Sequence, residues 1–239
     1  MLLTEKKIYF GIDSAVSSTI PTLLELNSSI YGKYILNSKM GIGAVVNMLN
    51  YLYSGEYPGA ANIAWTEAKI NLAFSWKIID ILQIGVSINS SSYGSSSSVH
   101  GEKKQMSSGF DGGIGFLLAI NNFYFGASGN NLLEFGNASS RQLSLGVSYN
   151  FSGIGLIPSA DAICTFDKSS VDINVGVQYE LLKILKLRAG VEIIGNFKTF
   201  SPSIGATYKL GNIDISYAGT YNLTFGSFGN HIIGMGLSF

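Results

Sequence analysis

The sequence predicts an all-β protein, a single antiparallel up-and-down β-barrel of about fourteen strands that spans a membrane. Apolar residues alternate with small or polar ones along most of the chain, which is the period of a β-strand. Only 13% of the residues are charged, whereas 46% are hydrophobic and 29 are glycine. This composition suits strands with lipid on one side and a small polar space on the other. Short and long connections also alternate between the segments, as they do in membrane barrels.

The first seven expected strands follow from alternation alone and cover residues 8–13, 30–36, 40–48, 69–78, 82–89, 110–118 and 123–128. Their apolar faces are Ile8, Phe10 and Ile12; Ile30, Tyr34 and Leu36; Met40, Ile42, Val46 and Met48; Ile70, Leu72, Phe74, Trp76 and Ile78; Leu82, Ile84, Val86 and Ile88; Phe110, Ile114, Phe116 and Leu118; and Phe123 and Phe125. The opposite faces carry residues such as Lys69, Asn71 and Asn89, so we expect these to face the lumen.

The second seven alternate more regularly and cover residues 143–151, 159–166, 171–181, 185–193, 200–210, 213–223 and 231–239. Their apolar faces are Leu143, Leu145, Val147, Tyr149 and Phe151; Ala160, Ala162, Cys164 and Phe166; Val171, Ile173, Val175, Val177, Tyr179 and Leu181; Leu185, Leu187, Ala189, Val191 and Ile193; Phe200, Ile204, Ala206, Tyr208 and Leu210; Ile213, Ile215, Tyr217, Tyr221 and Leu223; and the four named in the next paragraph. Fourteen is an even number, as expected when both ends lie on one rim.

The last strand has one apolar face, made of Ile233, Met235, Leu237 and Phe239, and one small, mostly polar face. Its final residue is aromatic, and in this the segment resembles the C-terminal strand of bacterial outer-membrane barrels. The resemblance implies that these four residues form a C-terminal insertion signal. The alternative is a strand of an ordinary β-sandwich.

The connections separate a barrel from a sandwich. Those expected to be short are 37–39, 79–81, 121–122, 182–184 and 211–212, and those expected to be long are 14–29, 51–66, 90–108, 130–140, 195–199 and 223–230. Two depart from this rule, because 152–158 is long for the short rim and 167–170 is short for the long one. We expect 90–108 to be a mobile polar surface loop, and 23–26 to be a short helix or a hydrophobic surface loop.

Composition also excludes several classes of function. A net charge of zero gives no basic face for nucleic acid, and a single cysteine, Cys164, allows neither an intramolecular disulfide nor a cysteine-rich zinc site. No apolar run reaches the roughly 18 residues of a transmembrane helix. No signal peptide is recognisable, so we expect a mature or N-terminally shortened chain in which residues 1–239 form one barrel domain.

Charges of both signs occupy the lumen face of neighbouring strands. The expected lumen-lining residues are Asp172, Glu180, Lys186, Arg188, Glu192, Lys209 and Asp214. They could select what passes through the barrel, or they could pair across strands and hold the wall together. Arg188 and Glu192 have opposite charges on one face, so we expect them to anchor such a network.

The order of short motifs resembles the PorV-like branch of the FadL-type outer-membrane barrels. The matching segments are 47–51, 82–86, 109–115, 125–132, 142–149, 187–190 and 228–231. The resemblance implies a bacterial outer-membrane barrel of fourteen strands. It also implies an N-terminal hatch with an Asn-Pro-Ala motif, which this sequence lacks, since none of its four prolines follows an asparagine.

Three functions fit this resemblance: passing or holding small hydrophobic molecules, acting as the barrel partner of a secretion or surface-attachment apparatus that binds proteins through its loops, or a mainly structural role. We expect contacts with outer-membrane lipid and with the barrel-assembly machinery, and no cofactor, metal or enzymatic activity. The two histidines, His100 and His231, suggest no catalytic base. The glycines around Asp111 lie within a strand, not at a strand-to-helix turn, so they do not form a phosphate-binding loop.

Overall fold

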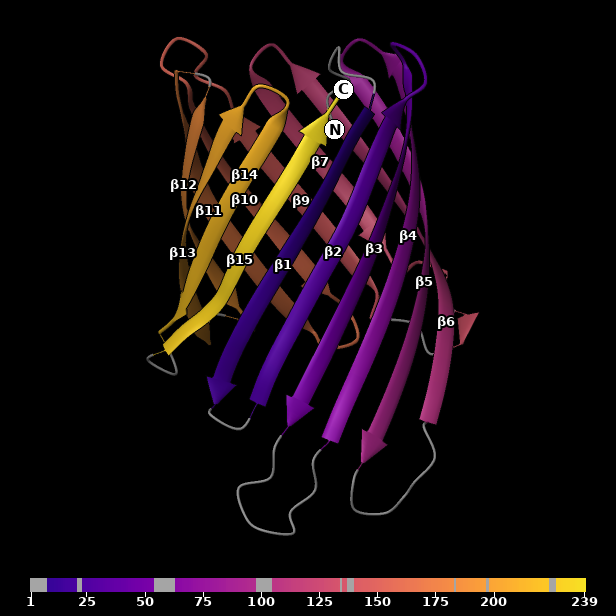
Figure 1. Cartoon of the computed structure of the whole chain (residues 1–239). Helices are drawn as coiled ribbons and strands as arrows, with labels where there is room; N and C mark the ends of the chain where they lie inside the picture. The colour runs from indigo at the N-terminus through magenta and orange to yellow at the C-terminus, as the bar shows by residue number, and fades with distance from the viewer. Residues whose placement is uncertain are drawn as a thin grey trace.

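The computed structural model describes residues 8–20, 23–53, 63–97, 105–133, 135–136, 140–182, 184–196, 198–223 and 227–239. They fold into a tall barrel of tilted strands whose N- and C-terminal strands lie side by side (Figure 1). No helix in these ranges is long and apolar enough to cross a membrane.

The strands of the first half are β1 (Ile8–Ile20), β2 (Leu23–Ile35), β3 (Met40–Tyr53), β4 (Ile63–Ile79), β5 (Leu82–Ser97), β6 (Gln105–Ile120) and β7 (Phe123–Asn130). Those of the second half are β8 (Phe135–Gly136), β9 (Gln142–Tyr149), β10 (Leu156–Thr165), β11 (Ser170–Leu181), β12 (Leu185–Ile194), β13 (Thr199–Leu210), β14 (Ile213–Asn222) and β15 (Ser227–Ser238).

Each strand of the wall pairs antiparallel with the next one along the chain, with β7 pairing directly with β9, and β1 pairs with β15 to close the sheet. The two-residue β8 pairs only with β6, beyond the end of β7. Fourteen strands therefore form the closed wall and β8 is an addition to it, which confirms the predicted fold class.

The apolar side chains lie on the outside of this barrel. Ile30 is 58% exposed, Ile204 69% and Ile233 64%, and the only buried hydrophobic side chains among the described residues are Ile35 and Ala127. A soluble monomer rarely leaves contiguous apolar patches larger than a few hundred Å² in water. An outward apolar surface around a polar interior is instead the arrangement of a membrane barrel.

Glycines form notches where the first and last strands meet. A Cβ atom on Gly236 would overlap the hydroxyl group of Tyr9, and one on Gly234 would overlap the carboxylate of Asp13. Tyr9 in turn stacks on Tyr31, with ring centroids 5.9 Å apart. The absence of side chains on these glycines lets larger groups lie flat against the lumen wall, across the seam that closes the barrel.

Several strands are longer than alternation predicted. Residues 14–20 continue β1, and residues 23–26 open β2 in register with β1 and β3, so the expected long loop 14–29 and the short helix or loop at 23–26 are wrong. Strands also extend into the expected loops at 51–66, 90–108 and 223–230, where β3 ends at Tyr53, β4 begins at Ile63, β5 reaches Ser97, β6 begins at Gln105 and β15 begins at Ser227.

Length explains these errors. β4 has 17 residues, whereas a tilted strand crosses the hydrocarbon core in about 9–11. The excess can stand outside the lipid, where neither face has to be apolar. The Ser-rich end of β5 therefore keeps its backbone pairing with β4 and β6 without the alternation by which strands are recognised.

Candidate functional site

The lumen contains a polar cavity of about 750 Å³ on the side of the longer connections. Fifteen of its eighteen lining residues are polar or charged; Ile70, Ile194 and Gly195 are the others. Strands β3 to β7 and β9 to β12, with their connections, contribute to this lining. Such a surface suits water, ions and hydrogen-bonding groups better than apolar molecules.

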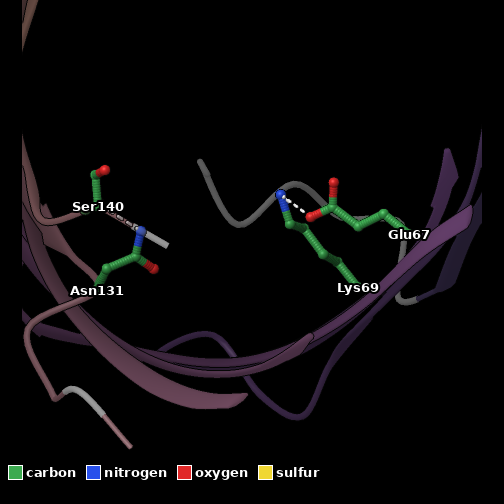
Figure 2. Close-up of polar contacts among 4 residues, drawn as sticks. All are labelled: Glu67, Lys69, Asn131 and Ser140. Carbon is green, nitrogen blue, oxygen red and sulfur yellow. Dashed lines mark hydrogen bonds and ion pairs between the residues drawn. The ribbon is translucent and has the colours of Figure 1, made fainter. Parts of the chain in front are cut away.

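Two polar contacts involve the cavity-lining residues Lys69, Asn131 and Ser140 (Figure 2). Lys69 Nζ lies 2.6 Å from Glu67 Oε1 on β4, and the Asn131 side-chain amide donates a hydrogen bond of 2.8 Å to the carbonyl oxygen of Ser140. The second contact ties together the two ends of the connection that carries β8. Glu67 was not predicted as a lumen residue. It lies directly after the expected loop 51–66, where the sequence does not alternate and so did not indicate that β4 begins at Ile63.

A second cavity, of about 580 Å³, lies against the lumen side of β9 to β13. Both Arg188 and Glu192 line it. The guanidinium of Arg188 donates hydrogen bonds to Gln178 Oε1 at 2.9 Å and to Thr207 Oγ1 at 2.8 Å. Arg188 thus joins β11, β12 and β13, with neutral partners in place of the expected carboxylate.

The other expected lumen residues are placed by strand register. Glu180 lies directly opposite Lys186, and Lys209 directly opposite Asp214. Asp172 lies apart from them in the larger cavity, where its carboxylate accepts a hydrogen bond of 2.7 Å from the Gly195 amide. The ion pairs among described residues are Lys69–Glu67 and Lys77–Asp80, so none of the seven is in an ion pair with another.

Sequence reasoning left out Asp161, which extends the row containing Glu192. Asn174 Nδ2 donates a hydrogen bond of 2.8 Å to Asp161 Oδ2, and Asn174 is directly opposite Glu192 in the register of β11 and β12. The alternation of β10 puts Asp161 on the lumen face, which is the signal that could have found it.

At the opposite rim, the β4–β5 turn carries an exposed ion pair. Lys77 Nζ lies 3.0 Å from Asp80 Oδ1. The hydrogen bond from Lys77, helped by its charge, lowers the pKa of the Asp80 carboxyl. Because Asp80 is fully exposed, this pair is a minor feature of the turn.

Replacing Arg188 with Ala is expected to lower barrel stability modestly, by about 1 kcal/mol, because two hydrogen bonds at a water-filled surface are lost. The midpoint of urea unfolding in detergent, read from the folded and unfolded bands on a gel, measures it. Lys186→Ala is the control, since it removes a lumen cation from the same strand. An Arg188→Ala midpoint no lower than that of Lys186→Ala would show that the hydrogen bonds do not stabilise the wall.

Residues 27–236 match the family described as the type IX secretion system membrane protein PorP/SprF. The chain belongs to the PorP/SprF family. The match covers nearly the whole barrel, from β2 into β15. No curated protein matches the chain.

Solved structures share the fold of this PorP/SprF chain. The P. putida toluene transporter TodX is 12% identical, with a TM-score of 0.74 over 99% of this chain and 91% of that one. The CymD monoaromatic hydrocarbon channel is 13% identical, with a TM-score of 0.71 over 99% and 89%. A P. aeruginosa FadL homologue is 11% identical, with a TM-score of 0.68 over 98% and 90%.

Identities this low show the fold alone, which is that of FadL-type barrels. Together with the family match, they place the chain in the bacterial outer membrane, as the sequence predicted. In barrels of this kind the short turns face the periplasm and the longer connections face outward. The larger polar cavity therefore lies toward the cell exterior.

Proposed function

We propose that this barrel is an outer-membrane component of a type IX secretion apparatus and binds other proteins of that apparatus through its loops. Membership of the PorP/SprF family supports this role. The observation that carries it is the polar lining of the larger lumen cavity, where fifteen of eighteen residues are polar or charged. Residues 1–239 would act as one barrel domain, without cofactor or enzymatic activity.

The competing function is the passage of small hydrophobic molecules. It is favoured by the likeness to TodX, a toluene transporter, and to CymD, a monoaromatic hydrocarbon channel. Against it stands the larger cavity, where fifteen of eighteen lining residues are polar or charged. An apolar solute entering that cavity would strip water from amide and carboxylate groups without replacing their hydrogen bonds, which is unfavourable.

Deleting the gene in its own bacterium tests the two functions against each other. We expect the deletion strain to lose proteins from the cell surface and the medium, measured by quantitative proteomics, and to take up labelled toluene and fatty acid as before. Restoring the wild-type gene should restore secretion. Normal secretion with reduced hydrocarbon uptake would overturn the proposal and support the competing one.

We further propose that Ile233, Met235, Leu237 and Phe239 act as a C-terminal insertion signal for the barrel-assembly machinery. Ile233 and Met235 on β15, and Phe239 directly after its end, are exposed. Replacing Phe239 with Ala is expected to lower the amount of folded barrel in the outer membrane several-fold, because the terminal aromatic is lost.

Heat-modifiable mobility on gels of isolated outer membranes measures the folded fraction. Leu210→Ala is the matched control, since Leu210 is 59% exposed at the same rim and Phe239 is 63% exposed. Equal losses for the two variants would show that only general hydrophobicity matters at position 239.

A further inference from the structure

The glycines around Asp111 lie where the barrel wall is interrupted. β7 pairs with residues 114–120 of β6, and β8 pairs with Gly109 and Phe110. Between these points the connection after β7 replaces a strand. Its Leu132 amide donates a hydrogen bond of 2.9 Å to the carbonyl oxygen of Gly112, and its Leu133 amide donates one of 3.1 Å to Asp111 Oδ1.

Asp111 is a buried carboxylate with one oxygen left over. It is 7% exposed, and its Oδ1 accepts hydrogen bonds from the amides of Gly112 and Leu133. Its Oδ2 is buried and has no hydrogen-bond partner among the described residues. A buried negative charge is costly unless it is paired, so a cation beside this oxygen would be favourable. Asp111 also lines the larger cavity.

Gly113 lies on β6 two residues after Asp111 and on the same lumen face. A cluster of oxygen atoms lies over it. A Cβ atom placed on Gly113 would lie 2.7 Å from Ser87 Oγ, 3.0 Å from the Gly129 carbonyl oxygen and 3.1 Å from Asn130 Oδ1. These oxygens come from β5 and β7, so they surround one point from both sides of β6. Asn130 also lines the larger cavity together with Asp111.

We propose that Asp111 and this oxygen cluster bind a calcium ion. Ca²⁺ takes six to eight oxygen ligands from carboxylates, carbonyls, amides and water, in flexible geometry. Asp111 Oδ2 supplies the charge, the Ser87, Gly129 and Asn130 oxygens supply neutral ligands, and water reaching the site through the cavity completes the shell. The ion would link β5, β6 and β7 beside the interrupted part of the wall.

Because the proposed site has a single carboxylate, we expect its affinity for calcium to be low. No group of three or more His, Cys, Asp or Glu side chains suited to a metal occurs among the described residues, so neutral oxygens dominate this site. We expect a dissociation constant in the range of about 10⁻⁴–10⁻³ M, which is typical of extracellular calcium modules. Magnesium should bind less well, because it needs near-ideal octahedral geometry and gives up water reluctantly.

Calcium binding and thermal unfolding of the purified barrel in detergent test the proposal. After treatment with EDTA, equilibrium dialysis with ⁴⁵Ca²⁺ should give one ion per barrel, and about 5 mM CaCl₂ should raise the unfolding temperature by roughly 3–6 °C. Asp111→Asn keeps the size of the side chain and an acceptor for Leu133, and Gly113→Ala fills the cluster. Both should abolish the bound ion and the temperature shift.

Asp172→Asn is the matched control, because Asp172 is a carboxylate in the same cavity, and it should bind calcium like the wild type. If Gly113→Ala does not fold, Asp111→Asn and Asp172→Asn still decide the question. A wild-type barrel that neither binds calcium nor becomes more stable with it would overturn the proposal. Equal binding in Asp111→Asn, or equal shifts with MgCl₂, would also overturn it by showing adventitious cation binding only.

Discussion

Ile204→Arg is expected to destabilise the barrel by about 2–4 kcal/mol, the cost of an arginine facing lipid near the middle of a membrane barrel. Ile204 is at the centre of β13 and is 69% exposed on the outer face. The free energy of unfolding, from urea titration in lipid vesicles, measures this cost. The effect should be among the largest of any single substitution, because no partner for the charge exists within the acyl chains.

The neighbouring residue provides the control at the same depth. Ser203 lies on the opposite face and lines the lumen cavity of about 580 Å³, so Ser203→Arg places the same charge in a space that water and polar groups share. We expect it to cost much less than Ile204→Arg. Equal costs, or a greater cost for Ser203→Arg, would mean that the outer face is not in contact with lipid.

Gly155→Ala is expected to destabilise the barrel by about 1–3 kcal/mol, because Gly155 has a positive φ of 69°, a conformation that costs other residues about this much. A Cβ atom there would also lie 2.6 Å from the backbone oxygen of Glu180. That oxygen cannot move freely, because the Glu180 amide donates a hydrogen bond of 2.8 Å to the Gly155 carbonyl. The backbone of β11 would therefore have to shift.

Gly153→Ala is the control within the same connection, since a Cβ atom on Gly153 would meet nothing within 4 Å. The unfolding midpoint of Gly153→Ala should equal that of the wild type or exceed it slightly, because alanine reduces the freedom of the unfolded chain. If Gly155→Ala were as stable as Gly153→Ala, the tight contact between this turn and β11 would be disproved.

Alternation predicted the barrel because lipid imposes it on the chain. Wherever a strand crosses the membrane, its outer residues must be apolar, and so residues 70–78 and 171–181 could be assigned to faces without any knowledge of the structure. Strand ends outside the lipid carry no such constraint. Residues 14–20 and 90–97 are held by backbone hydrogen bonds, which leave no trace in the order of side chains.

The sequence could predict which residues face the lumen, but it could not predict which of them contact one another. Parity assigned Arg188 to the lumen face of β12, but its partners depend on the register with β11 and β13, which put Gln178 and Thr207 beside it. The long connection 130–140 was predicted, and β7 does end at Asn130. Its hydrogen bonds to β6 could not be foreseen, because nothing in the order of Leu132, Leu133 and Phe135 indicates them. Only the structure shows that the Asp111 side chain accepts the hydrogen bond of the Leu133 amide there, in place of a backbone carbonyl of a neighbouring strand.

The claim that the apolar face meets lipid is tested most directly by the two tryptophans. Trp76 is on the outer face of β4, near the periplasmic rim, and is 46% exposed. Trp65 has the parity of the lumen residues Glu67 and Lys69, and is equally accessible, at 45%. Trp65→Phe leaves Trp76 alone, and Trp76→Phe leaves Trp65 alone, so each can be followed by its fluorescence in vesicles.

Lipids brominated near the headgroup end of the acyl chain should quench Trp76 strongly and iodide should quench it weakly, whereas Trp65 should respond in the opposite way. Quenching of Trp76 by iodide and not by brominated lipid would contradict the account, because the apolar side chains of the wall would then face water or the protein interior.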